Sequence, residues 1–267
     1  MGQTVAFEKL NNVRDLGLVP LATGREMKKG ILFRADQLFP ATPDDREKIK
    51  ELGITQVIDL RSLAEAAQKP DPEIPGVENI ALPVVEDMRP GVTRDDESTT
   101  SLLHTLVAGA EADSHFVDNY MGSLYRAFVI DPFSSAQYTT FVDLVIGAAQ
   151  HDRAILWHCT AGKDRAGFAA VILLKALGAE DDVILQDYLF TNECLVDDVN
   201  AMVASLGDAL PSWLEPAFRR VFRAEEPFLQ AAYDAADKVY GGFDSYLEQA
   251  LGIDDAKRAR LESALCN

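Results

Sequence analysis

The residues of this sequence most suited to chemistry lie in the segment HCTAGKDRAG, residues 158–167, where Cys159 is followed after five residues by Arg165. An apolar run at residues 153–157 precedes the segment, and the apolar sequence FAAVILLKAL follows it. This order predicts a loop that joins a strand to a helix. A thiol at such a helix N-terminus faces unpaired N–H donors and the positive end of the helix dipole, which favour the nucleophilic thiolate.

The same loop has the features of an anion-binding site. Five intervening residues let successive N–H groups converge on one point, and Gly162 allows backbone angles that a β-carbon would forbid. Arg165 can place a planar fork of donors on two phosphate oxygens, as a lysine could not. We therefore expect a phosphate ion to be bound here by Arg165 together with the loop residues Thr160, Ala161, Gly162, Lys163 and Ala166.

The chemistry that fits this geometry is in-line transfer of a phosphoryl group to the sulfur of Cys159, where positioning and charge stabilisation supply most of the catalysis. Asp164 would lie beside the leaving-group oxygen and is our first candidate for the general acid. We expect His158 to orient the loop by hydrogen bonding. Lys163 either adds charge for a second phosphate of the substrate or is a surface lysine.

The composition limits the partners. A formal net charge of −18 argues against attraction to nucleic acid or to an anionic membrane, although local donors can still bind an anion at contact distance. No apolar stretch reaches the roughly 20 residues that span a bilayer. We therefore expect neither a nucleic acid partner nor a membrane span.

The cysteines indicate the compartment. Cys159, Cys194 and Cys266 are far apart and odd in number, so neither a disulfide framework nor a zinc site is suggested. No signal-peptide pattern is visible. We expect a reducing, cytoplasmic location, with no metal and no cofactor.

The remaining pattern predicts the elements that position the loop. Strands are expected at residues 31–35, 54–60, 77–85 and 153–157, a helix from Thr42 to about residue 52, and helices at 227–240, 243–251 and 254–265. We expect one α/β domain over residues 1–267, with a central, mostly parallel sheet flanked by helices. Residues 88–119 are expected to form a helical lid insertion, and the C-terminal part to be helical.

The segment HCTAGKDRAG resembles the phosphate-binding loop of the protein tyrosine phosphatase superfamily, above all that of bacterial phosphatases with a Cys-x-x-Gly-Lys-Asp-Arg loop. The likeness covers nearly the whole chain and includes NVRD at 12–15, DLRS at 59–62, DYL at 187–189 and residues 241–252. It implies a cysteine-phosphatase-like fold and hydrolysis of phosphate monoesters through a cysteinyl-phosphate. The implied substrate is a phosphorylated protein or a phosphoinositide. We expect an ion-pair network around the loop, formed by Arg14, Asp15, Asp59 and Arg61.

The resemblance adds two candidates for the general acid. The family places an aspartate shortly after a Leu-Pro pair, and here Leu82-Pro83 is followed by Glu86 and Asp87. We rank Asp164 first and Asp87 second, with Glu86 as the alternative in register.

Three other functions share parts of this pattern. A phosphoinositide phosphatase uses the same loop chemistry, and a weakly active phosphate-binding module would need the loop alone. A sulfurtransferase of the rhodanese kind also has a curled cysteine loop, but Gly162-Lys163-Asp164-Arg165 and the DLRS segment disfavour it.

Members of the superfamily usually have Ser or Thr after the arginine, where the hydroxyl stabilises the departing thiolate, whereas this chain has Ala166. We predict slow breakdown of the cysteinyl-phosphate and faster dephosphorylation in Ala166→Ser, measured by trapping the intermediate formed from an aryl phosphate. An unchanged rate in that variant would contradict the prediction.

Overall fold

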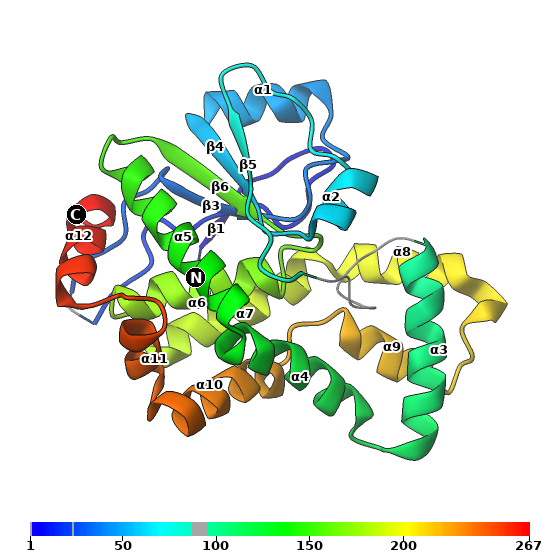
Figure 1. Cartoon of the computed structure of the whole chain (residues 1–267). Coiled ribbons are helices and arrows are strands. Elements are labelled where there is room, and N and C mark those ends of the chain that lie inside the picture. Colours follow the sequence, from blue (N-terminus) through cyan, green and yellow to red (C-terminus); the bar gives the residue numbers. More distant parts are fainter. Residues whose placement is uncertain (1, 23, 87–95) are drawn as a thin grey trace.

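The computed structural model describes residues 2–22, 24–86 and 96–267. In this part of the chain six strands form one sheet in the order β1-β2-β3-β6-β4-β5, with helices packed on both faces (Figure 1). The strands are β1 (Gln3–Thr4), β2 (Arg14–Asp15), β3 (Leu32–Ala35), β4 (Ile54–Asp59), β5 (Glu78–Ala81) and β6 (Ala154–His158).

Parallel pairing places the carboxyl ends of four strands at one edge of the sheet. β6 lies between β3 and β4, and β4 pairs with β5, all in parallel, whereas β1 and β2 add antiparallel pairs beyond β3. The expected mostly parallel sheet is confirmed. Loops that follow β3, β4, β5 and β6 therefore meet at the same edge, where ligands of open α/β sheets bind.

Helices make up most of the remaining described chain. Those before β6 are α1 (Pro43–Glu51), α2 (Leu63–Gln68), α3 (Asp96–Ala112), α4 (Phe116–Ile130) and α5 (Pro132–Ala149). Those after it are α6 (Arg165–Ala176), α7 (Asp181–Cys194), α8 (Val196–Leu206), the short 3₁₀ helix η1 (Gly207–Ala209), α9 (Glu215–Val221), α10 (Glu226–Tyr240), α11 (Phe243–Gln249) and α12 (Asp255–Leu265).

The central strand β6 contributes to two cores. Ala154 and Leu156 point to one face, where they join the apolar cluster that includes Ile49 of α1. Ile155 and Trp157 point to the other face, which is covered by α5 and α6. Because both faces are buried, the strand is apolar along its length rather than alternating.

Local signals explain where α1 begins. The Thr42 hydroxyl accepts a hydrogen bond from the Asp45 N–H, the Asp45 carboxylate accepts one from the Thr42 N–H, and Pro43 occupies the first turn. This capping box satisfies N–H groups that the helix itself cannot. The predicted start at Thr42 is confirmed.

The structure differs from expectation in the middle of the chain. Residues 88–95 of the expected lid insertion lie outside the described residues, and the rest of the insertion is α3 together with the beginning of α4. Leu102 and Leu106 of α3 are fully buried and belong to the main core. A lid role for this segment stays a prediction.

No helix in the described ranges combines the length and the apolar character that crossing a membrane requires.

Candidate active site

The segment 159–164 forms a loop between the central strand β6 and the N-terminus of α6. Cys159, the first residue of this loop, is only 2% exposed. Asp164, the N-cap residue of α6, makes no capping hydrogen bond with its side chain. Among the described residues, the N–H groups of Thr160, Ala161, Gly162 and Asp164 donate to no backbone carbonyl, so they can serve an anion.

The carbonyl groups of the loop are held from outside. The Cys159 carbonyl lies 3.0 Å from Nδ1 of His158. The Thr160 carbonyl accepts a hydrogen bond of 3.1 Å from the N–H of Gln37, in the loop after β3.

The next two carbonyls are held by side chains of distant segments. Ala161 accepts a hydrogen bond of 2.9 Å from Asn12 Nδ2, and Gly162 accepts one of 2.7 Å from Arg34 Nη2. Because the C=O and N–H of a trans peptide point in opposite directions, holding these carbonyls outward turns the following N–H groups inward. The loop is thereby fixed as a set of converging donors.

Asn12 is itself fixed by a buried carboxyl group. Asp36, directly after β3, accepts hydrogen bonds from the N–H groups of Asn11 and Asn12 at 3.2–3.3 Å. Burial raises the pKa of Asp36 to about 6. The segment before β2 and the end of β3 thus support the loop together.

Gly162 is required by its surroundings. Its φ of +66° lies in the left-handed region, and an added Cβ would be 2.4 Å from the Ala35 carbonyl oxygen. Both a strained backbone and a steric clash would follow from any larger residue here.

Arg165 is held by a residue that the sequence analysis missed. Its Nη1 and Nη2 donate to Oε2 and Oε1 of Glu65 at 2.6 and 2.9 Å, a bidentate pair with both side chains buried. Burial alone would lower the pKa of Arg165, but the ion pair with Glu65 raises it. The guanidinium is therefore a fixed positive charge at the loop.

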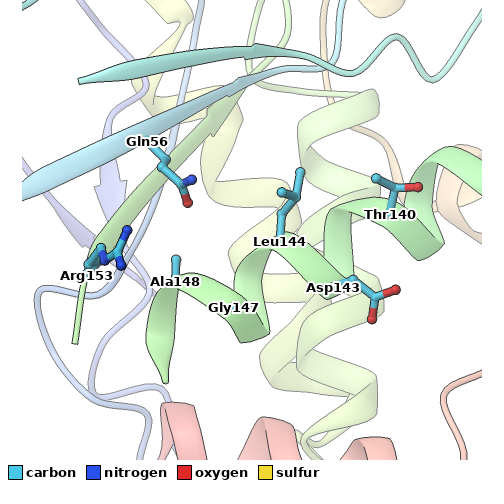
Figure 2. A pocket seen from close by; sticks show the side chains of 7 residues that line it. All are labelled: Gln56, Thr140, Asp143, Leu144, Gly147, Ala148 and Arg153. Atoms are coloured by element: carbon cyan, nitrogen blue, oxygen red, sulfur yellow. The ribbon is translucent and has the colours of Figure 1, made fainter. Parts of the chain in front are cut away.

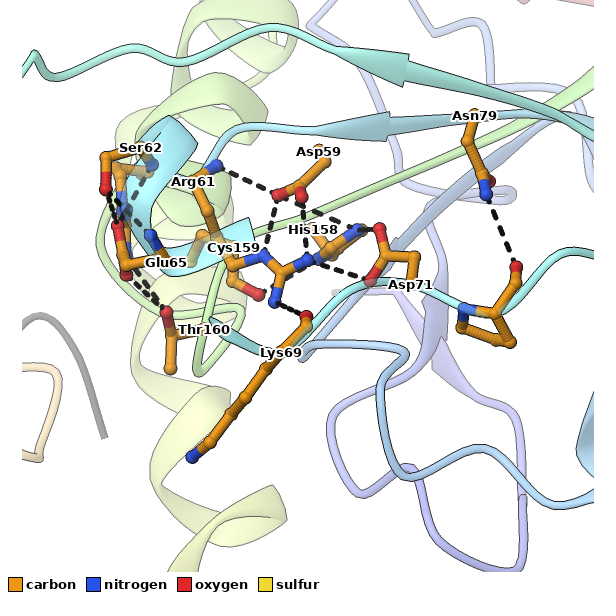
Figure 3. A network of polar contacts seen from close by, with 12 residues as sticks. Asp59, Arg61, Ser62, Glu65, Lys69, Asp71, Asn79, His158, Cys159 and Thr160 are labelled. Atoms are coloured by element: carbon orange, nitrogen blue, oxygen red, sulfur yellow. Dashed lines mark hydrogen bonds and ion pairs between the residues drawn. The ribbon is translucent and has the colours of Figure 1, made fainter. Parts of the chain in front are cut away.

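Glu65 also joins the loop to α2. It accepts a hydrogen bond from the Thr160 hydroxyl at 2.7 Å, and from the N–H and hydroxyl of Ser62 at 3.0 and 2.9 Å (Figure 3). Burial alone would raise the pKa of Glu65, but Arg165 and these donors lower it to about 2. The signal in the sequence was the capping pattern Ser-x-x-Glu at residues 62–65, directly after the DLRS match.

His158 belongs to a second buried network on the same edge (Figure 3). Its Nε2 lies 2.8 Å from Asp71 Oδ2, and Arg61 donates to both Asp59 and Asp71 at 2.7 and 2.9 Å. Burial alone would lower the pKa of His158, but Asp71 and Asp59 raise it to about 9. The imidazole is thus a cation at neutral pH, and its other nitrogen holds the Cys159 carbonyl.

Asp59, Asp71 and His158 also lie close enough together to surround a metal ion. The Arg61 guanidinium already donates to both carboxylates, and a cationic imidazole has no lone pair for a metal. These groups therefore fit an ion-pair network better than a metal site.

The predicted network around the loop consists of two separate parts. Asp59 and Arg61 belong to the His158 network, whereas Arg14 pairs with Asp187 instead. Asp15 is not in either: its carboxylate accepts hydrogen bonds of 2.8 Å from the N–H groups of Gly17 and Gly30.

Asp164 is fixed by contacts on one oxygen. Its Oδ1 accepts a hydrogen bond of 2.8 Å from Tyr125 OH and lies 3.1 Å from Lys163 Nζ. Tyr188 OH lies 2.6 Å from Tyr125 OH. Burial raises the pKa of both tyrosines, so Tyr125 remains a neutral donor to the carboxylate.

Lys163 is not a surface lysine, which corrects one of the two expectations for it. It is 1% exposed, and its Nζ donates to the carbonyls of Val221 and Arg223 at 2.6 and 3.1 Å. Its long side chain thereby connects the loop to the end of α9.

The other predicted site residues lie as follows. Ala166 is fully buried in the first turn of α6, and its carbonyl accepts a hydrogen bond of 3.0 Å from Trp157 Nε1. Glu86 is exposed, in the segment after β5. Asp87 lies outside the described residues.

A surface hollow elsewhere contains none of these residues. It is lined by Gln56 of β4, by five residues of α5 (Thr140, Asp143, Leu144, Gly147 and Ala148), and by Arg153 directly before β6 (Figure 2). This is the amino end of the parallel strands, opposite the loop.

Comparison with known proteins gives consistent matches. The sequence profile described as the tyrosine phosphatase family matches residues 5–267. A provisionally named tyrosine-protein phosphatase of Cupriavidus necator is 32% identical over 256 residues, which cover 95% of this chain and 86% of that protein. The triple specificity protein phosphatase PtpB of Mycobacterium tuberculosis is 29% identical over 263 residues, covering 91% and 93%.

Among solved structures, the crystal structure of TpbA from P. aeruginosa matches 78% of this chain and 89% of its own, with 12% identity and a TM-score of 0.34.

The Glu65–Arg165 pair leads to a prediction about stability. Glu65→Gln should lower the free energy of unfolding by about 3–5 kcal/mol at pH 7, because it removes the charge of one member of a buried, bidentate ion pair. Since the folded-state pKa of Glu65 is lowered from 4.5 to about 2, this stabilisation is complete above pH 4.5 and is lost as the pH falls through about 2.

Urea unfolding of wild type and variant from pH 3 to 8 measures this difference. It should be constant above pH 5 and shrink below pH 4.5. The exposed Glu86→Gln is the matched control and should change stability by less than about 0.5 kcal/mol. If the difference in the free energy of unfolding between wild type and Glu65→Gln increases as the pH falls, the proposed stabilisation by this ion pair is wrong.

Proposed function

The chain belongs to the tyrosine phosphatase family and is a phosphatase; from that premise we propose that Cys159 is its nucleophile and Arg165 its phosphate clamp. The observation that carries this proposal is the loop itself. The buried Cys159 opens a loop whose carbonyls are held by donors outside it, and the guanidinium of Arg165 is fixed by Glu65 in a bidentate pair. These are the parts that phosphoryl transfer to sulfur requires.

The first step forms a bond between Cys159 Sγ and phosphorus and breaks the bond from phosphorus to the ester oxygen. The three equatorial oxygens take hydrogen bonds from the N–H groups of the loop and from Arg165. Because Glu65 holds the guanidinium in place, this stabilisation costs no reorganisation during the reaction. The ester oxygen leaves as an alcohol or a phenol after it receives a proton.

The second step transfers the phosphoryl group to water. The oxygen of water attacks phosphorus, the bond to sulfur breaks, and the thiolate of Cys159 is restored together with inorganic phosphate. The carboxylate that donated the proton in the first step takes one from the water. Neither step draws on a metal or an organic cofactor.

Among the candidates that the structure describes, Asp164 fits the role of the general acid best. It lies in the loop, and the Tyr125 and Lys163 contacts both engage Oδ1, so we propose that Oδ2 serves the leaving group. Glu86 is exposed on the segment after β5 and is the alternative. Asp87 stays a candidate on the grounds of sequence alone.

The position of Lys163 bears on the substrate class. Its ammonium contacts Asp164 and the carbonyls of Val221 and Arg223, so we expect it to contribute little to binding a second phosphate. We infer that a phosphorylated protein side chain, foremost phosphotyrosine, is preferred over a phosphoinositide headgroup.

Two further expectations belong to this proposal. The main core contains residues from Leu16 to Cys266, which supports one phosphatase domain over residues 1–267. A thiolate nucleophile requires a reducing environment, which supports a cytoplasmic location.

The nucleophile is tested by Cys159→Ser. We predict that turnover of p-nitrophenyl phosphate falls at least about 10³-fold, because a serine hydroxyl at this position lacks the anionic form that the loop stabilises. Binding of inorganic phosphate, measured by calorimetry, should persist. Cys194→Ser is the control and should keep wild-type turnover; full activity in Cys159→Ser would end the proposal.

The general acid is tested with two leaving groups. In Asp164→Asn, kcat for phenyl phosphate should fall by about 10²–10⁴, whereas p-nitrophenyl phosphate, whose leaving group needs little protonation, should lose much less. The same two rates are measured for Glu86→Gln, which removes the alternative general acid. Equal losses on both substrates would show that Asp164 acts only on the structure of the loop.

The substrate class is tested with a panel of phosphotyrosine peptides, phosphoserine peptides and phosphoinositides in the presence of EDTA. We predict the highest kcat/KM for phosphotyrosine peptides, by about tenfold or more. A higher value for phosphoinositides would overturn the inference drawn from Lys163.

A further inference from the structure

A second set of charged side chains lies beneath the phosphate loop. Arg14 and Arg34 are both fully buried, and Asp187 of α7 is 1% exposed. Arg34 Nη1 lies 2.7 Å from Asp187 Oδ2, and Arg14 Nη2 lies 3.9 Å from the same oxygen. Two guanidinium groups thus share one carboxylate, so this group carries one positive charge more than its carboxylate neutralises.

The acceptors of the two guanidinium groups other than Asp187 are uncharged, and they satisfy only part of the N–H groups. Arg14 donates to the Thr191 hydroxyl at 3.2 Å and lies over the ring of Phe190. Among the residues that the structure describes, Nε and Nη1 of Arg14 and Nε of Arg34 are buried without a hydrogen-bond acceptor. A buried, partly unsatisfied cation is destabilising by itself. A negative charge nearby in the site would therefore stabilise this cation.

Arg34 connects this charge to the loop. It lies on β3 beside Trp157 of β6, two residues before Cys159, and its Nη2 donates to the Gly162 carbonyl at 2.7 Å. Burial and the neighbouring Arg14 lower the pKa of Arg34 to about 10, while Asp187 and Cys159 act in the opposite direction. Arg34 is thus cationic at neutral pH, and its guanidinium contacts the loop that begins at Cys159.

We propose that Arg34, with Arg14 behind it, is a positioning residue whose buried positive charge stabilises the thiolate of Cys159 from below, and that Asp187 limits this charge. The inference rests on the proposed role of Cys159 as the nucleophile. Arg34 does not touch the substrate: it acts on the thiolate through the field and on the loop through the Gly162 carbonyl.

Other charged or titratable groups lie in the loop or on the segments that support it. They come from β6 (His158), from the loop and α6 (Asp164 and Arg165), from α2 (Glu65), from α5 (Tyr138) and from the end of β3 (Asp36). The test therefore changes the charge beneath the loop and leaves these groups in place. Arg34→Met also removes the hydrogen bond to the Gly162 carbonyl, and the double variant, which lacks this bond but restores the charge, separates the two effects.

Four proteins vary that charge in steps. The group Arg14–Arg34–Asp187 carries one net positive charge in the wild type, none in Arg34→Met, two in Asp187→Asn, and again one in the double variant Arg34→Met/Asp187→Asn. The readout is the pH dependence of alkylation of Cys159 by iodoacetamide, followed by mass spectrometry of the peptide that contains it. Only the thiolate reacts.

We expect the pH midpoint of alkylation to rise by about one unit in Arg34→Met and to fall by about one unit in Asp187→Asn, which is a tenfold change in the thiolate fraction each way. The double variant should return to within a few tenths of a unit of the wild type. The acidic limb of the profile of kcat/KM against pH should shift in the same directions.

If Arg34 and Asp187 only support the structure of the loop, both single variants should disturb it. Both pH midpoints would then move in the same direction, and the two shifts would add in the double variant. That result, or no shift in either single variant, overturns the inference. Circular dichroism identifies folded proteins, and Arg34→Lys, which keeps the charge but not the fork, should keep the wild-type midpoint. If Cys159→Ser remains active, the proposed function itself fails, independently of these midpoints.

Discussion

The orientation of four peptide groups, from Cys159–Thr160 to Gly162–Lys163, is the constraint on which the site depends. An N–H group of this loop can face a phosphate only if the carbonyl of the preceding residue is held outward. The holding groups are a ring nitrogen of His158, the N–H of Gln37, the amide of Asn12 and the guanidinium of Arg34. They come from β6, from β3 and the loop after it, and from the segment before β2. The sheet order, with β6 beside β3, is what delivers these donors to one loop.

The charged groups around the loop are also fixed in place. The chain as a whole has a formal charge of −18, yet cations gather beneath and beside the loop. Three of them are fixed by a carboxylate from another segment: Arg165 by Glu65 of α2, His158 by Asp71, and Arg34 by Asp187 of α7. A cation held in this way keeps its position when an anionic substrate arrives, so electrostatic stabilisation does not have to be assembled during the reaction. The acidic surface and the cationic loop are therefore compatible, because contact distance outweighs the screened field of remote charges.

Local patterns were sufficient to predict β4, β6, the beginning of α1 and the loop with its glycine, since each depends on residues close in sequence. They were not sufficient for the partners of the loop. Glu65 is 100 residues from Arg165, and Arg34 is 128 residues from Gly162, so no periodicity connects them. An arginine within the apolar strand at residues 31–35 was nevertheless a usable signal, because a charge is rarely buried without a partner. Lys163 was expected either to face a second phosphate or to lie on the surface, and the packing of α9 against the loop gives it a third position. Glu65 was also hidden because its helix, α2, has only six residues, too few to show a helical period in the sequence.

The most direct measurement of this account is a crystal structure of Cys159→Ser with inorganic phosphate. We expect one tetrahedral anion above residue 159. Its oxygens should accept hydrogen bonds from the N–H groups of the loop and from two nitrogens of Arg165, while the carbonyls of Ala161 and Gly162 still face Asn12 and Arg34. An anion bound elsewhere, or a loop in which either carbonyl has turned toward the anion, would contradict it.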